Sequence, residues 1–194
     1  MNVQDLEIRI EYDQYAENPR EMFDNLGKIV YHSNRYMLGD EDISPDEFEM
    51  PKDAIYLPVY ANIHGSISLS VSEYAGSWDS GMSGYIYTTP DKIREFYGDN
   101  IPSESDIKEA LKGEIAEFSA YLSGEVYGYR ILDRRTGEEL DSCWGFYGYD
   151  YCREYAEGEA QGIVDSANQR EYDSAVREYL YAREKYQAIA KEIA

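Results

Sequence analysis

Two cysteines and five aromatic rings share the segment DSCWGFYGYDYC, residues 141–152, which raises the question of redox or metal chemistry. Cys143 and Cys152 are nine positions apart. This spacing fits neither the C-x-x-C pattern of redox pairs nor a recognised zinc site. The two histidines, His32 and His64, occur in unrelated contexts. The pattern therefore predicts two ordinary buried thiols.

A second set of reactive groups lies in GDEDISPDEFEMPKD, residues 39–53. Its carboxylates are Asp40, Glu41, Asp42, Asp46, Glu47, Glu49 and Asp53. The odd spacing from Asp40 to Asp46 resembles a calcium loop, but Pro45 stands where an EF-hand needs glycine. The run PDEFEMPK resembles the PD…ExK pattern of metal-dependent nucleases, but Glu49 and Lys52 are one residue too far apart. We expect an exposed acidic loop with no metal, no cofactor and no catalytic residue.

The aromatic residues of the 141–152 segment also suggest a platform on which nucleic-acid bases could stack. Such platforms are accompanied by basic grooves. The neighbours of Trp144, Tyr147, Tyr149 and Tyr151 are acidic instead. A core or a protein interface is therefore the favoured interpretation, with Cys143, Phe146 and Tyr149 pointing inward.

The charge balance is the strongest compositional signal: 39 acidic and 18 basic residues give a net charge of −21. Direct binding to nucleic acid and to anionic membranes is disfavoured, because both depend on Lys and Arg. A basic partner protein is favoured. The 21 net charges correspond to the phosphates on about 36 Å of duplex DNA, or about ten base pairs. Plain solubility is the alternative explanation for the acidity.

Periodicity predicts an α+β fold. LEIRIEY (6–12) alternates as a strand, 54–63 and 66–74 form two more strands, and 84–89 forms another. Helices are expected from the cap at Thr89-Pro90 to Gly98, from Ser103 to 123, and from Asp150 onward. Residues 28–38 fit neither period, and 125–148 form a hairpin. We expect a single domain with a mostly antiparallel sheet, helices on one face and a C-terminal helix.

The C-terminal helix carries a seam at alternating spacings of four and three residues, with a helix break expected near Gly158 and Gly162. Its apolar members are Tyr172, Val176, Tyr179, Tyr186 and Ile193. We therefore divide the chain into a core, residues 1–168, and a helix, residues 169–194, through which two copies associate as a homodimer. The first thirteen residues lack the features of a signal peptide, so we expect a cytoplasmic protein.

Three blocks, NPREMFDNLGKIVYH, WDSGMSGYIYTT and DSCWGFYGYDYC, resemble the motifs of a family of small acidic proteins encoded by phages and mobile elements. The resemblance covers most of residues 1–155. It implies counter-defence, with no catalytic residues: inhibition of Cas9 or of restriction enzymes.

The function expected from charge and resemblance together is an acidic, non-enzymatic inhibitor that occupies the nucleic-acid site of a host-defence nuclease, anti-CRISPR ahead of anti-restriction. Its partner-binding residues are Asp40, Glu41, Asp42, Asp46, Glu47 and Glu49. The alternatives are a metal-dependent enzyme acting on nucleic acid and a structural phage interaction protein.

Overall fold

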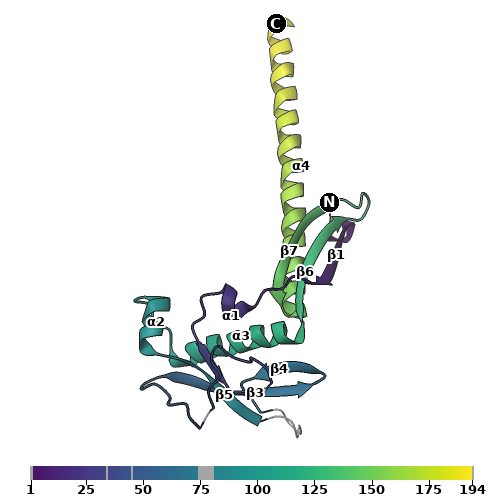
Figure 1. Ribbon diagram of the computed structural model, residues 1–194. Helices are drawn as coiled ribbons and strands as arrows, with labels where there is room; N and C mark the ends of the chain where they lie inside the picture. The colour runs from purple at the N-terminus through teal and green to yellow at the C-terminus, as the bar shows by residue number, and fades with distance from the viewer. Residues whose placement is uncertain (1, 34, 45, 74–80, 194) are drawn as a thin grey trace. The chain divides into compact units, whose positions relative to one another are not determined.

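The computed structural model describes residues 2–33, 35–44, 46–73 and 81–193. Contacts between residues group the chain into two compact units that interleave along the sequence. The first comprises residues 1–11, 128–144 and 150–194, and the second comprises residues 12–127 and 145–149. Figure 1 shows the elements of both units.

The second unit is built on a four-stranded antiparallel sheet with the strand order β2-β5-β3-β4. The strands are β2 (Lys28–Tyr31), β3 (Ile55–His64), β4 (Ser66–Ser70) and β5 (Gly81–Thr88). Residues 28–31 of the ambiguous segment thus form a strand at the sheet edge. Gly84 is required in β5, because a side chain there would overlap the carbonyl oxygen of Val30 on the paired strand.

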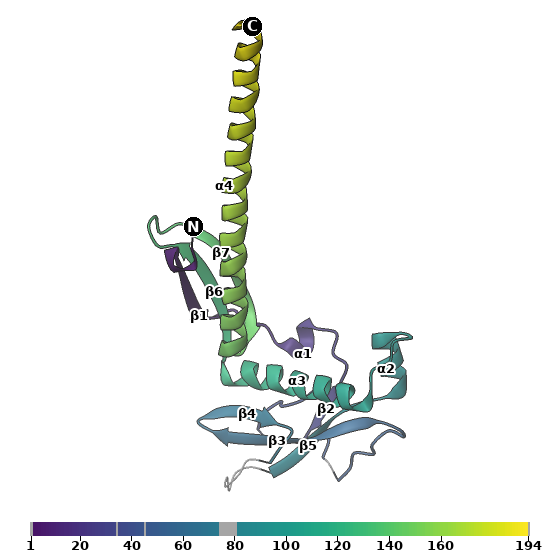
Figure 2. The same cartoon turned by 180° about the vertical axis from the view of Figure 1, so that it is seen from behind.

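Helix α3 (Glu104–Ser123) covers one face of this sheet (Figure 2). Ser103 and Asp106 form a capping box at its start, and Gly124 ends it in the left-handed conformation with φ of 75°. Its buried side chains recur at helical spacing and pack on the apolar face of the sheet. The core includes Ile107, Leu111, Ile115 and Phe118 from the helix, and Ile29, Val59, Leu69 and Ile86 from the strands.

Two short helices complete this unit. Helix α2 (Pro90–Tyr97) starts at the predicted cap, where the Thr89 side chain accepts a hydrogen bond from the backbone N–H of Lys92. Helix α1 (Pro19–Met22) is capped by Asn18, whose side chain accepts a hydrogen bond from the backbone N–H of Arg20. The capping signals around residue 90 were therefore sufficient to locate α2.

The first unit contains most of a three-stranded sheet with the order β1-β6-β7, preceded by a 3-10 turn at Val3–Asp5. The strands are β1 (Leu6–Tyr12), β6 (Val126–Asp133) and β7 (Glu139–Tyr147). The Asp133 carboxylate accepts hydrogen bonds from the backbone of Arg135 and Thr136 in the hairpin turn, where Gly137 has φ of 73°. The predicted hairpin is confirmed.

Helix α4 (Tyr149–Ile193) packs on this sheet through its first half. Every fourth residue from 152 to 164 is buried, namely Cys152, Ala156, Ala160 and Val164. The small side chains let the helix approach the strands closely. The expected break near Gly158 and Gly162 is wrong, because the helix continues through both and neither glycine has a neighbouring side chain that would exclude a methyl group.

The α+β class, the antiparallel sheets and the C-terminal helix are confirmed. The described residues of the acidic segment, 39–44 and 46–53, form no helix or strand, as its prolines predict. The first residues of the WDSGMSGYIYTT block, 78–80, lie outside the described ranges. The boundary predicted after residue 168 falls within the continuous α4 and stays a prediction.

Candidate functional site

The acidic loop 39–53 begins along the outer edge of β2, in the second unit. Glu41 forms a parallel bridge with Val30, and its carbonyl oxygen accepts a hydrogen bond from the N–H of Tyr31 at 3.0 Å. The N–H groups of Asp40 and Glu41 donate to the carbonyl oxygen of Ile29. The first part of the loop is therefore bonded to the sheet, and it covers part of the strand's free edge.

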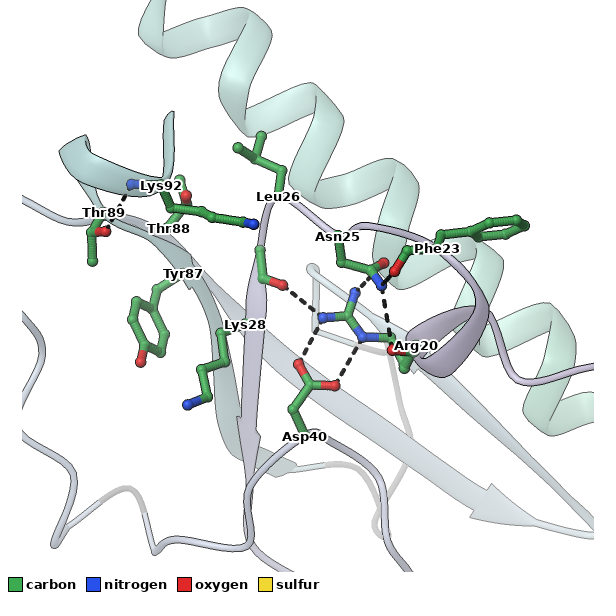
Figure 3. A pocket seen from close by; sticks show the side chains of 11 residues that line it. Arg20, Phe23, Asn25, Leu26, Lys28, Asp40, Tyr87, Thr88, Thr89 and Lys92 are labelled. Carbon is green, nitrogen blue, oxygen red and sulfur yellow. Dashed lines mark hydrogen bonds and ion pairs between the residues drawn. The ribbon is translucent and has the colours of Figure 1, made fainter. Parts of the chain in front are cut away.

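A buried arginine holds the same part of the loop by its side chain. The guanidinium of Arg20 donates to both carboxylate oxygens of Asp40, at 3.0 Å from Nε and 2.6 Å from Nη2 (Figure 3). It also donates to the side chains of Asn25 and Glu114, each at 2.8 Å, and to the Gly27 carbonyl at 2.6 Å. All five N–H groups of the guanidinium thus have an acceptor.

The carboxylates around Arg20 have further bonds to the backbone. The N–H of Ile29 donates to Asp40 at 2.7 Å, and the N–H of Leu26 donates to Glu114 at 2.7 Å. Burial lowers the pKa of Arg20, but the hydrogen bonds and charges of Asp40 and Glu114 outweigh it and raise that pKa above its ordinary value. Asp40, predicted as a partner-binding residue, therefore has a structural role.

The second part of the loop is held by an aromatic side chain. The Phe48 ring lies 5.3 Å from the ring centroid of Tyr87 and 6.4 Å from that of Tyr85, both on β5. A turn precedes it, in which the carbonyl oxygen of Ser44 accepts from the N–H groups of Glu47 and Phe48. This anchor was not predicted from the sequence, in which one aromatic residue within a run of carboxylates is its only signal.

Near these two anchors, Asp40 and Phe48, other carboxylates of the loop face solvent. Asp46, Glu47 and Glu49 are exposed, and Asp42 is exposed with one oxygen 3.0 Å from Nδ1 of His32. Glu41 is half-buried and pairs with Lys28 at 2.6 Å. Four of the six predicted partner-binding residues thus form an exposed acidic group, which we call the loop carboxylates: Asp42, Asp46, Glu47 and Glu49.

A cavity of about 510 Å³ lies beside the loop (Figure 3). Arg20, Lys28 and Lys92 line it together with Tyr87 and residues 88–89. The cations are already neutralised: Lys28 pairs with Glu41 at 2.6 Å, and Lys92 pairs with Asp24 at 3.1 Å. The cavity therefore offers little excess positive charge to an anionic ligand.

The two cysteines differ in their surroundings. Cys152 lies on the buried side of α4, as predicted, and burial raises the pKa of its thiol to about 11. Cys143 is exposed on β7, so the expectation that it is buried and points inward is wrong. The reason is that the strand presents this position to solvent while Phe146, three residues later, is buried.

The aromatic segment 141–152 runs from a strand into a helix, as expected. Phe146 points inward, but Tyr149 is 48% exposed, so its predicted orientation is wrong. Trp144 packs over Gly128, where any side chain would overlap the indole ring. The Tyr147 hydroxyl donates to the carbonyl oxygen of Glu17 at 2.8 Å. These contacts are those of a packed surface rather than of a row of free rings.

The predicted self-association residues lie in the second half of α4. Tyr172, Val176 and Tyr179 are 65%, 37% and 67% exposed. Tyr186 and Ile193 belong to the same helix, but their side chains lie outside the described part of the structure.

No protein-family model, curated protein or solved structure gives a significant match to this chain. Within the described ranges, no three His, Cys, Asp or Glu side chains are grouped so that they could hold a metal ion. No helix in those ranges has both the length and the apolar character needed to cross a bilayer.

Proposed function

We propose that this protein is a non-enzymatic inhibitor that occupies the nucleic-acid site of a host-defence nuclease, with a Cas9-type nuclease as the favoured target. The observation that carries the proposal is the set of loop carboxylates, exposed on a segment that is anchored at Asp40 and at Phe48. A nuclease offers Lys and Arg side chains spaced to neutralise phosphates. The loop carboxylates offer the matching charge without a nucleic acid.

Anchoring matters for affinity as well as for position. A loop that is already ordered loses less conformational entropy when it binds than a mobile acidic segment does. Asp40 and Phe48 supply this order through contacts to Arg20 and to β5. On this account, Asp40 and Glu41 position the site, and the loop carboxylates contact the partner.

An anti-restriction DNA mimic would use the same surface against a different nuclease, so the identity of the inhibited enzyme separates these two functions. A metal-dependent enzyme would need carboxylates that are free to bind a cation. Asp40 and Glu41 instead form ion pairs with Arg20 and Lys28, and Asp42 lies in hydrogen-bond distance of His32. A structural phage interaction protein would bind a partner without inhibiting any nuclease.

The test is an inhibition assay with a Cas9–guide RNA complex and with restriction enzymes. A variant with Asp42→Asn, Asp46→Asn, Glu47→Gln and Glu49→Gln should inhibit at least about tenfold less well, because each lost charge leaves a basic group of the nuclease unpaired. The matched control removes four exposed carboxylates elsewhere, by Glu95→Gln, Asp99→Asn, Glu109→Gln and Glu154→Gln.

The control variant has the same net charge as the loop variant and should inhibit nearly as well as wild type. Equal inhibition by both variants would show that net charge, and not this loop, is responsible. Absence of inhibition by the wild-type protein against every nuclease tested would contradict the proposal itself.

A further inference from the structure

The second half of α4 extends beyond the sheet that covers its first half (Figures 1 and 2). In the first half of α4, every fourth residue is buried, including Ala160 and Val164. The same spacing continues along the helix to Tyr172 and Val176, which are exposed. Most helical stability in proteins comes from packing of an apolar face rather than from intrinsic propensity. We therefore expect another surface to cover the exposed residues Tyr172 and Val176.

The sequence of this half follows a heptad repeat in which large and small residues alternate. Tyr172, Tyr179 and Tyr186 take position a, and Ala175 and Ala182 take position d. Ile189 and Ile193 continue the same register, and Asn168 precedes it. Val176 flanks this seam at position e. The pattern is that of a two-helix coiled coil, with its two core positions of very different size.

Charge identifies a second copy of this chain as a suitable partner. Residues 169–194 contain five acidic and five basic side chains, so the whole net charge of −21 lies on residues 1–168. Two copies that approach through residues 1–168 would repel each other strongly. The C-terminal half of α4 is neutral, so two copies can meet there without this repulsion.

Three features favour an antiparallel arrangement. It places position a of one helix opposite position d of the other, so Tyr179 faces Ala182 of the second copy, and large residues fill the space beside small ones. The second feature is charge pairing: the antiparallel arrangement brings Glu178 close to Lys185 of the second copy, and by symmetry this favourable pair occurs twice. It offsets the unfavourable approach of Glu171 to Glu192 of the second copy.

The third feature is the separation of the acidic regions. An overlap of 25 residues is about 38 Å long, and the antiparallel arrangement puts residue 168 of the two copies, where the acidic part of each chain ends, at opposite ends of it. This distance is several times the screening length of about 8 Å at physiological salt. A parallel pair would place both regions at the same end.

We propose that residues 168–193 of α4 form an antiparallel two-helix coiled coil with a second copy of this chain. The dimer does not depend on the proposed inhibitory function. Its first test is analytical ultracentrifugation of the full-length protein, with Tyr179→Lys as the disrupting variant and Tyr181→Lys as its matched control. Tyr179 and Tyr181 are 67% and 70% exposed, but Tyr181 lies on the opposite face of the helix.

Wild type and the Tyr181→Lys variant should sediment as dimers, while Tyr179→Lys should raise the dissociation constant at least tenfold. A monomeric wild-type protein at concentrations of hundreds of micromolar would overturn the proposal. Equal weakening by both substitutions would also overturn it, because the seam would then have no special role.

Cysteine cross-linking tests the orientation. In a Cys143→Ser background, the double variant Ala175→Cys and Tyr186→Cys should form a covalent dimer on oxidation, because these positions face each other across an antiparallel pair. The single variant Ala175→Cys should not, since its two copies lie about 16 Å apart along the axis. Efficient cross-linking of the single variant would establish the parallel arrangement and contradict the proposal. Buried Cys152 can remain in place.

Discussion

At the residue scale, Arg20 connects segments that are distant in sequence. Its guanidinium joins Asp40, 20 positions away, to Glu114, 94 positions away. Local patterns do predict local structure, as in the helix starts at Ser103 and at Thr89-Pro90. No local pattern marks Arg20, because its role depends on the packing of α1, β2 and α3. The same limit explains why Cys143 was wrongly expected to be buried.

Replacing Arg20 with Met should lower the free energy of unfolding by about 3 kcal/mol or more, because two partly buried carboxylates would lose their cation. Urea denaturation at neutral pH measures this loss. The control is Lys28→Met, which breaks an exposed pair with Glu41 and should cost less than about 1 kcal/mol. The Arg20 side chain is 6% exposed and that of Lys28 is 47% exposed. Similar losses in the two variants would contradict the role given to Arg20.

At the scale of elements, alternation and capping residues were enough to predict most strands and helices. The β-strand at 6–12 and the helix at 104–123 follow directly from their apolar spacing. The short strand β2 was ambiguous, because Ile29, Val30 and Tyr31 are all buried and therefore show no alternation. The order of the loop itself was not predictable, since it depends on Phe48 meeting two tyrosines of another strand.

Phe48→Ala should loosen the second part of the acidic loop without changing its charge. Amide hydrogen exchange at residues 46–50 should become at least about tenfold faster, while exchange in the four-stranded sheet stays unchanged. Inhibition of the target nuclease should weaken as well, because a mobile loop loses more conformational entropy when it binds.

The control for this variant is Phe96→Ala on α2, where Phe96 is 42% exposed and packs against its neighbour Tyr97. It should leave exchange in the loop unaltered. Unchanged exchange at residues 46–50 in the Phe48→Ala variant would mean that Phe48 does not anchor the loop.

At the scale of the whole molecule, charge is distributed very unevenly. The net charge of −21 lies entirely on residues 1–168, and the C-terminal half of α4 is neutral. This division matches the two roles proposed: an acidic region for a basic partner and a neutral helix for a second copy. The sequence alone reveals the division, whereas the exposure of individual loop carboxylates required the structure.

The most direct test of the central claim is the affinity for an inhibited nuclease, measured by isothermal titration calorimetry at salt concentrations from about 50 to 500 mM. If the loop carboxylates replace phosphates, the logarithm of the dissociation constant should rise linearly with the logarithm of salt concentration, since ions compete for each charge pair. The slope should be smaller for the Asp42→Asn, Asp46→Asn, Glu47→Gln, Glu49→Gln variant than for its matched control. Tight binding with no dependence on salt, or the same slope in both variants, would contradict the account.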